Sequence, residues 1–122
     1  MEQLNRSDVS AWVDRYIRAW NSNGADDIGE LFTDDAIYLT GPFDAPWEGR
    51  QRIVDQWLEE RDEPGTTSFS YEVIAVDGDL GVVQGRATYV EPPVVYGNLW
   101  LIRLAPDGRC SHFTEYWMKR KD

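Results

Sequence analysis

A glutamate stands among aromatic residues near the end of the chain, where residues 110–119 read CSHFTEYWMK. In a β-strand alternate side chains share a face, so Phe113, Glu115 and Trp117 would point the same way. Burial beside two rings penalises the charged carboxylate, raises its pKa and brings it toward the range useful for general acid or base catalysis. The alternative is structural, with Glu115 paired to an arginine or to a tyrosine hydroxyl.

Two other reactive side chains are weaker candidates. His112 is the single histidine, and strand alternation places it on the face opposite Glu115, with Glu72 or Arg86 as possible neighbours. Cys110 is the single cysteine, so it has no internal disulfide partner, and no histidine is placed by motif to activate it as a nucleophile. No Cys/His set has zinc spacing, so we expect no metal and no cofactor.

Composition limits the classes of partner. The 122 residues, 42% of them hydrophobic, are enough for one domain with a real core, spanning 1–122. Twelve Lys and Arg against 22 Asp and Glu give a net charge of −10, which repels nucleic acid and anionic lipid surfaces. No stretch approaches the roughly 20 apolar residues needed to cross a bilayer. We therefore expect a cytoplasmic protein without a nucleic acid or membrane partner.

The first half of the chain has helical periodicity. Ser7 and Asp8 are placed to cap a helix that ends at Asn21–Gly24, and Asp26 to cap a second, shorter helix. A third helix is expected from Gly49 to Arg61. The inward positions of the three are Val9, Trp12, Val13, Tyr16, Ile17 and Trp20, then Ile28, Leu31 and Phe32, then Ile53, Val54, Trp57 and Leu58.

The second half changes to the alternation of strands. We expect a short strand at 36–39 before a Gly/Pro loop at 41–46, then strands around 69–75, 81–91, 96–104 and 109–119, separated by turns. Helices followed by a meander indicate an α+β fold, with helices packed on one face of a curved antiparallel sheet.

The order of these elements resembles the nuclear transport factor 2-like superfamily, in particular its SnoaL-like and ketosteroid-isomerase-like branch. The similar stretches are RYIRAWNSNGADDIGELFTDDAIY at 15–38, PWEGRQRIVDQW at 46–57 and APDGRCSHFTEYW at 105–117. The resemblance implies a cone-shaped curved antiparallel sheet wrapped around three helices and enclosing an apolar pocket. Residues 21–50 would form part of its wall and mouth.

The resemblance also implies catalytic positions, and this chain departs from two of them. Tyr16 matches the tyrosine that donates a hydrogen bond to the developing enolate. The proton-moving aspartate falls on Thr40, and the second donor, a protonated aspartate, falls on Trp100. The usual isomerase mechanism is therefore not expected. Asp44 is either a substitute base or, in its Pro-flanked loop, a solvated turn residue.

By the same resemblance, Phe113, Glu115 and Trp117 point into the pocket. Glu115 and Tyr16 are then the candidate catalytic residues. Aromatic side chains at such spacings more often form core, and for Tyr38 the two roles are balanced. The candidate ligand-binding residues are Trp12, Trp20, Tyr38, Trp57, Trp100, Phe113 and Trp117.

Together these features favour a protein that binds a small, largely apolar molecule, such as a polycyclic or carbonyl-bearing one, in an aromatic pocket. If it is an enzyme, cofactor-independent acid/base isomerisation, dehydration or aldol cyclisation is the expected class, with Glu115 moving the proton and Tyr16 stabilising the oxyanion. The alternative is a non-enzymatic ligand-binding or protein-interaction module.

We also expect a homodimer through the sheet face opposite the pocket. That face carries a mixture of side chains too apolar for plain exposure and too polar for core, as in partly wet two-fold interfaces. Its expected members are Ile74, Val76, Val82 and Val90 together with Glu72, Gln84, Arg86 and Thr88.

Overall fold

The computed structural model describes residues 4–61, 66–90 and 93–120, which form an α+β fold of three helices and one six-stranded sheet. The elements are α1 (Arg6–Ser22), α2 (Ala25–Gly29), β1 (Phe32–Leu39), β2 (Trp47–Glu48), α3 (Arg50–Glu59), β3 (Thr67–Asp77), β4 (Leu80–Val90), β5 (Pro93–Leu104) and β6 (Cys110–Lys119). None of the helices in these ranges is long and apolar enough to cross a membrane.

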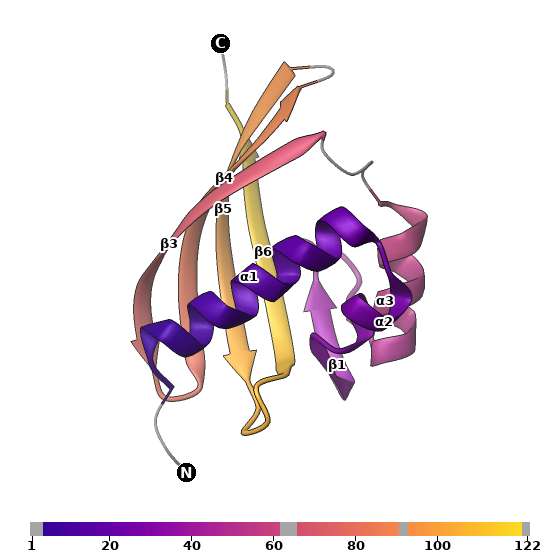
Figure 1. Cartoon of the computed structure of the whole chain (residues 1–122), viewed down its shortest axis with the longest axis vertical. Coiled ribbons are helices and arrows are strands. Elements are labelled where there is room, and N and C mark those ends of the chain that lie inside the picture. Colours follow the sequence, from indigo (N-terminus) through magenta and orange to yellow (C-terminus); the bar gives the residue numbers. More distant parts are fainter. Residues whose placement is uncertain (1–3, 62–65, 91–92, 121–122) are drawn as a thin grey trace.

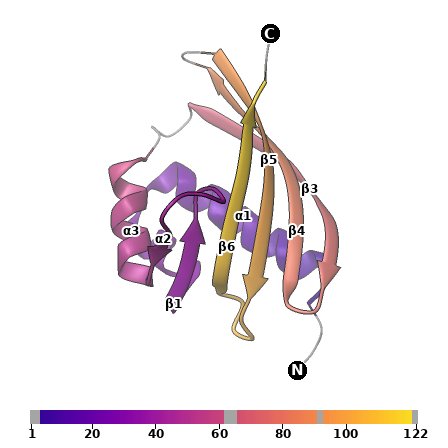
Figure 2. The ribbon, with the colours of Figure 1, turned by 180° about the vertical axis from the view of Figure 1, so that it is seen from behind.

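The sheet is curved and unclosed, with strand order β2-β1-β6-β5-β4-β3. Figure 2 shows the order from β1 to β3. β3 to β6 form the expected antiparallel meander. The sheet is not purely antiparallel as expected, because β1 and β6 run parallel to each other. Strand β1, far from β6 in sequence, thereby extends the sheet beside the strand that carries Glu115.

Helix α1 lies diagonally across the concave face of the sheet (Figure 1). Its N-cap is Asn5 rather than Ser7 or Asp8, because Asn5 and Asp8 bond reciprocally in a capping box. Its end is the one expected, with Asn23 in the left-handed conformation at φ 51°. Five residues of the expected stripe or beside it are buried: Val9, Trp12, Val13, Tyr16 and Ala19.

Several other boundaries differ from the sequence-based expectation. The cap of α2 is Gly24, with no side-chain bond from Asp26. Phe32 is buried as expected, but it begins β1, which starts four residues earlier than predicted. The two-residue strand β2 pairs with β1 and was not predicted.

A bulge in β3 changes the face that one residue presents. Val73 pairs with Val83 and Ala75 with Val82, so the register shifts between Val73 and Ala75. Beyond the bulge Val76 packs against the core. The prediction that Val76 belongs to the outer face is therefore wrong, because an extra residue inverts strand alternation.

The strands are longer than the helix that covers them. At 17 residues α1 spans about 25 Å, whereas β5, at 12 residues, spans about 40 Å. Figure 1 shows one end of β3 to β6 projecting beyond α1. Inward side chains at that end are not covered by the helix.

Gly81 sets how closely α1 approaches the sheet. A Cβ added there would lie 2.6 Å from Val9 Cγ2. We expect Gly81→Ala to lower the free energy of unfolding by about 1–3 kcal/mol, because the added methyl overpacks this contact. In the control Gly97→Ala, an added Cβ meets nothing closer than 4.0 Å. Equal stability of the two variants in urea unfolding would contradict close packing at Gly81.

Candidate functional site

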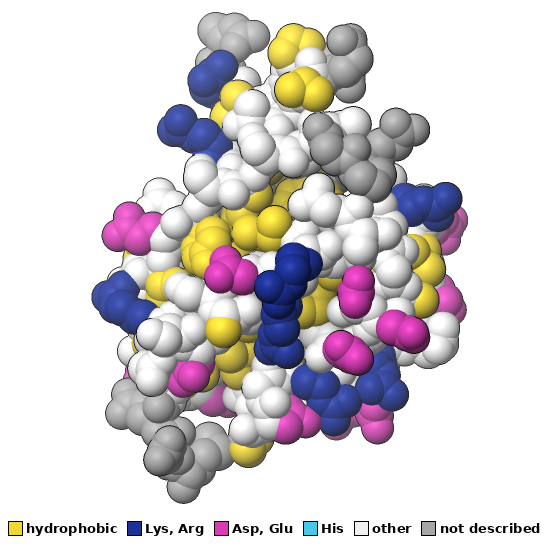
Figure 3. Space-filling model, in the orientation of Figure 1, with side chains coloured by type: hydrophobic (Ala, Val, Ile, Leu, Met, Phe, Trp, Pro, Cys, Tyr) yellow, Lys and Arg dark blue, Asp and Glu magenta, His cyan; other side chains and the backbone are white. Residues whose placement is uncertain are grey.

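A cavity of about 500 Å³ lies where the strands extend past α1. Figure 3 shows hydrophobic side chains in the middle of this face, below the projecting end of the sheet. Nine of its sixteen lining residues are Trp or Tyr, so its walls are mostly aromatic. The lining consists of Tyr16, Trp20, Tyr38, Thr40, Trp47, Trp57, Glu60, Arg61, Ala87, Tyr89, Val94, Tyr96, Asn98, Trp100, Glu115 and Trp117.

The structure brings most of the predicted site residues to this cavity. Both candidate catalytic residues line it, together with five of the predicted ligand-binding aromatics: Trp20, Tyr38, Trp57, Trp100 and Trp117. Tyr38 therefore has both of the roles considered above: it lines the cavity, and its ring is also part of the buried hydrophobic cluster.

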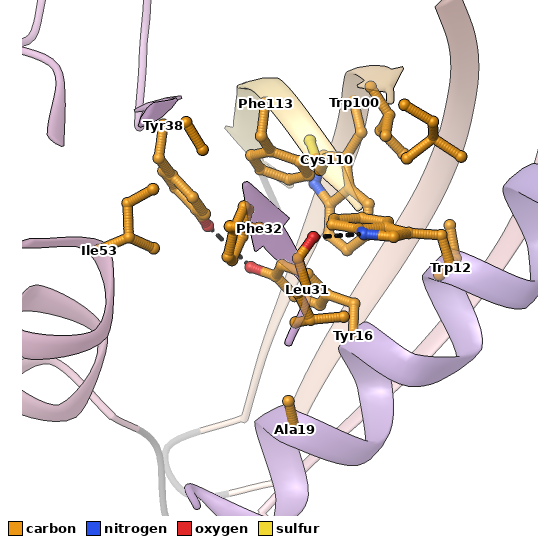
Figure 4. Close-up of a cluster of buried hydrophobic side chains, with 14 of the residues drawn as sticks. Trp12, Tyr16, Ala19, Leu31, Phe32, Tyr38, Ile53, Trp100, Cys110 and Phe113 are labelled. Carbon is orange, nitrogen blue, oxygen red and sulfur yellow. Dashed lines mark hydrogen bonds between the residues drawn. The ribbon is translucent and has the colours of Figure 1, made fainter. Parts of the chain in front are cut away.

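Trp12 and Phe113 do not line the cavity, so their prediction as ligand-binding residues needs correction. Both are fully buried, with ring centroids 5.7 Å apart. Trp12 Nε1 donates to the backbone oxygen of Leu31 at 2.9 Å (Figure 4). Trp12 lies one helical turn before Tyr16, and Phe113 lies two residues before Glu115 on β6. Both therefore lie where α1 covers the sheet.

Glu115 is held by two neighbours on β5. It lies opposite Trp100 in the β5–β6 register. Trp100 Nε1 donates to Glu115 Oε2 at 2.8 Å and Asn98 Nδ2 donates to the same oxygen at 3.0 Å. The predicted direction of Glu115, on the face of Phe113 and Trp117, agrees with this structure. Its partners are an indole and an amide rather than the arginine or tyrosine considered above.

Burial controls the ionisation of Glu115. Loss of solvent raises the pKa of its carboxyl, and the hydrogen bonds from Trp100 and Asn98, which favour the charged form, offset only part of that rise. Both bonds go to Oε2, and no described residue hydrogen-bonds to Oε1. The carboxyl thus combines a raised basicity with one oxygen not engaged by those residues.

A pair of tyrosine hydroxyls lies deeper in the same cavity. The hydroxyls of Tyr16 and Tyr38 are 2.7 Å apart, and either can be the donor (Figure 4). Burial and then the proximity of Tyr16 raise the pKa of Tyr38 well above its ordinary value, so that phenol stays protonated. Arg15 next to Tyr16 donates to Gly108 O at 2.9 Å and fixes α1 to the β5–β6 turn.

The remaining sequence candidates lie outside the cavity. His112 is exposed on the outer face, bonded to Ser111 and paired in register with Arg103 rather than with Glu72 or Arg86. Burial raises the pKa of the Cys110 thiol, which makes it a poor nucleophile. Asp44 accepts a hydrogen bond from Thr40 Oγ1 at 3.0 Å in an exposed turn, and it does not line this cavity.

Sequence reasoning missed Asn98 and Trp47. Asn98 lies two residues before Trp100 and therefore on the same face of β5, a signal that strand alternation contained. Trp47 reaches the cavity through the unpredicted strand β2, where its ring stacks on Tyr38 with centroids 4.7 Å apart. Within the described ranges, no three His, Cys, Asp or Glu side chains gather to hold a metal ion.

Fold and cavity together define an α+β cone with an aromatic interior at its open end. The family model of the SnoaL-like domain matches residues 13–117, so the chain belongs to the SnoaL-like family. No curated protein sequence matches it significantly.

Solved structures show the same fold. An NTF-2 like protein of unknown function from Burkholderia xenovorans has a TM-score of 0.74 at 16% identity, over 95% of this chain and 87% of that one. The epoxide hydrolase/cyclase-like enzyme SalBIII, of pyran ring formation in salinomycin, has a TM-score of 0.71 at 20% identity, over 89% of both chains. A ketosteroid isomerase-like protein from Erwinia carotovora atroseptica has a TM-score of 0.67 at 17% identity, over 94% of this chain and 97% of that one. At these identities the likeness is one of fold.

The raised pKa of Glu115 predicts a pH-dependent stability. As pH rises from about 4.3, the unfolded chain loses this proton before the folded one does, so the free energy of unfolding falls until the folded pKa is passed. Glu115→Gln has no ionisable group at this position, so its free energy of unfolding does not fall for this reason. We expect its stability relative to wild type to increase from pH about 4 to neutral pH in urea unfolding.

The control is Glu72→Gln, which removes the same charge from an exposed position on β3. Its stability difference from wild type measures what removal of an exposed charge does at each pH. A Glu115→Gln difference that does not rise with pH beyond that of the control would mean that burial does not raise the pKa of Glu115.

Proposed function

We propose that this protein binds a small, largely apolar, carbonyl-bearing molecule in the aromatic cavity and moves a proton on it without a cofactor. The observation that carries the proposal is the position of Glu115, which is partly buried, lines the cavity and has Oε1 free of described protein partners. Cavities of this size and apolar character commonly hold ligands of that kind.

Glu115 has the properties of a general base. Its raised pKa increases its basicity relative to an ordinary glutamate. The bonds from Trp100 and Asn98 fix Oε2, so Oε1 keeps a defined direction. A base held in this way loses little side-chain conformational entropy when it takes up its reactive geometry.

The tyrosine pair supplies the complementary donor. When Tyr16 donates to Tyr38 over their 2.7 Å contact, the proton of Tyr38 is directed elsewhere and can reach a ligand oxygen. When Tyr38 instead donates to Tyr16, the hydroxyl of Tyr16 becomes the donor to the ligand. A preorganised donor in an apolar site stabilises a developing oxyanion far better than the same group in water.

The reaction that these groups support is removal of a proton beside a carbonyl. The C–H bond breaks, its proton passes to Glu115 Oε1, and the electron pair ends on the carbonyl oxygen, which accepts a hydrogen bond from the tyrosine pair. Return of the proton at the same or another carbon completes the cycle. Isomerisation, dehydration and aldol cyclisation all contain this step.

Hydrogen–deuterium exchange tests this step directly. We expect the protein to accelerate deuterium incorporation beside the carbonyl of α-tetralone in deuterium oxide, followed by NMR. Glu115→Gln should reduce the catalysed rate by about a hundred- to ten-thousand-fold, since it removes the general base. Tyr16→Phe should give a smaller loss, because Tyr38 remains.

The charge-matched control Glu72→Gln should exchange at the wild-type rate. Binding of α-tetralone by calorimetry without any accelerated exchange would exclude the catalytic step and favour the non-enzymatic binding module. Exchange unaffected by Glu115→Gln would remove Glu115 from the role of base.

We propose in addition that the protein forms a homodimer through the outer face of the sheet. This is supported by the large apolar side chains exposed there, Val90, Tyr116 and Met118. A second cavity, of about 740 Å³, lies beside them and is lined in part by Phe43 and Leu99. Burial of such a face between two copies removes apolar surface from water.

Sedimentation tests the dimer. We expect a dimer at high micromolar concentration and a dissociation constant raised at least about tenfold in Met118→Glu, because a charge is desolvated at the interface. Glu59→Gln, on α3, should not change it. A monomeric wild type at that concentration would rule out the proposed assembly.

A further inference from the structure

Around Glu115 the two neighbouring donors are already engaged, and hydrogen-bond acceptors remain without a partner among the described residues. Trp100 Nε1 and Asn98 Nδ2 both donate to Glu115 Oε2. Glu115 Oε1 receives no bond from the described residues, and the buried Asn98 Oδ1 has no partner. A ligand group next to Glu115 is therefore best matched if it is a donor or carries positive charge.

Aromatic rings line the cavity together with this carboxyl. Trp117 follows it on the same face of β6 and packs edge-to-face with Tyr96, with centroids 5.7 Å apart. Tyr16 and Trp57, which also line the cavity, have centroids 4.7 Å apart, and the hydroxyl of Tyr16 contacts that of Tyr38. The faces of such rings attract a cation within about 6 Å of their centroids.

Charge also favours a cation over an anion. The cavity lining contains two acids, Glu60 and Glu115, and one base, Arg61. Arg61 is exposed and donates through Nη1 to the backbone oxygen of Leu58. Beyond the cavity, the net charge of −10 repels anions and attracts cations to the whole molecule.

We infer that the natural ligand of this cavity is an organic cation, whose protonated or quaternary amine lies beside the Glu115 carboxylate and whose apolar part packs between the tryptophan and tyrosine rings. This inference rests on the proposed function, in that it takes the cavity as a ligand site, and it names the chemical class of the ligand. The amine and the reacting carbonyl would then belong to one molecule.

A cation would offset the desolvation penalty that burial imposes on the Glu115 carboxylate. The carboxylate has lost much of its hydration, and its two protein hydrogen bonds replace that hydration only in part. An amine beside the carboxylate supplies the missing opposite charge, and a paired buried charge is far less costly than an unpaired one. A neutral ligand leaves that cost in place, and an anion adds to it.

Calorimetry with two probes of one shape tests the inference. The cation is benzyldimethyl(hydroxyethyl)ammonium, and its partner is the neutral analogue in which a quaternary carbon replaces the nitrogen. We expect the cation to bind at least about tenfold more tightly than the carbon analogue. Glu115→Gln should remove most of that preference while leaving the affinity for the neutral analogue within about twofold.

Two further variants separate local from general effects. Glu72→Gln removes an equal charge from the outer face and should retain the preference. Trp117→Leu, at a largely exposed position where the fold tolerates change, should weaken the cation more than the neutral analogue. Near-ultraviolet circular dichroism checks that each variant is folded.

The outcomes distinguish the inference from the proposed function. Equal affinity for the two probes in the wild type would overturn the cation preference and leave the cavity as a site for neutral ligands. A preference that survives Glu115→Gln would overturn the assignment of the amine to Glu115. If neither probe binds, and α-tetralone does not bind either, the inference and the proposed ligand site both fail.

Discussion

The mismatch in length between helix α1 and the strands beneath it is the constraint from which the site follows. A curved sheet of long strands presents more inward surface than a 17-residue helix can bury. Where α1 covers the sheet, Trp12 and Phe113 form solid core. Beyond its coverage, the next inward residues, Glu115 and Trp117, line a cavity.

The Trp100–Glu115 pair explains how this chain departs from the isomerases that it resembles. The resemblance implies a carboxylic acid donor at the position of Trp100. Here the carboxyl is on the neighbouring strand, and the indole N–H of Trp100 donates to it at 2.8 Å. The indole is therefore committed to positioning Glu115 and is not available to a ligand. Where the resemblance implies a donor to the ligand, this chain has an indole that bonds to its own carboxyl.

The aromatic packing around this pair keeps it rigid. Tyr16 lies 4.7 Å from Trp100 and 5.5 Å from Phe113 between ring centroids. On the opposite side Phe69 stacks on Trp100 at 4.7 Å, and the absence of a side chain at Gly85 makes room for Phe69. Rings with so few rotatable bonds lose little entropy when they order, so the indole that holds Glu115 is itself firmly placed.

The sequence alone determined the features that depend on local periodicity. The stripe of α1 and the shared face of Phe113, Glu115 and Trp117 follow from the 3.6- and two-residue repeats, which neighbours do not alter. Tertiary structure decided the rest. Trp12 and Trp20 lie on the same helix stripe, yet only the position of α1 on the sheet makes one core and the other cavity wall. Likewise the β3 bulge inverts Val76, because one inserted residue breaks the alternation on which the prediction rests.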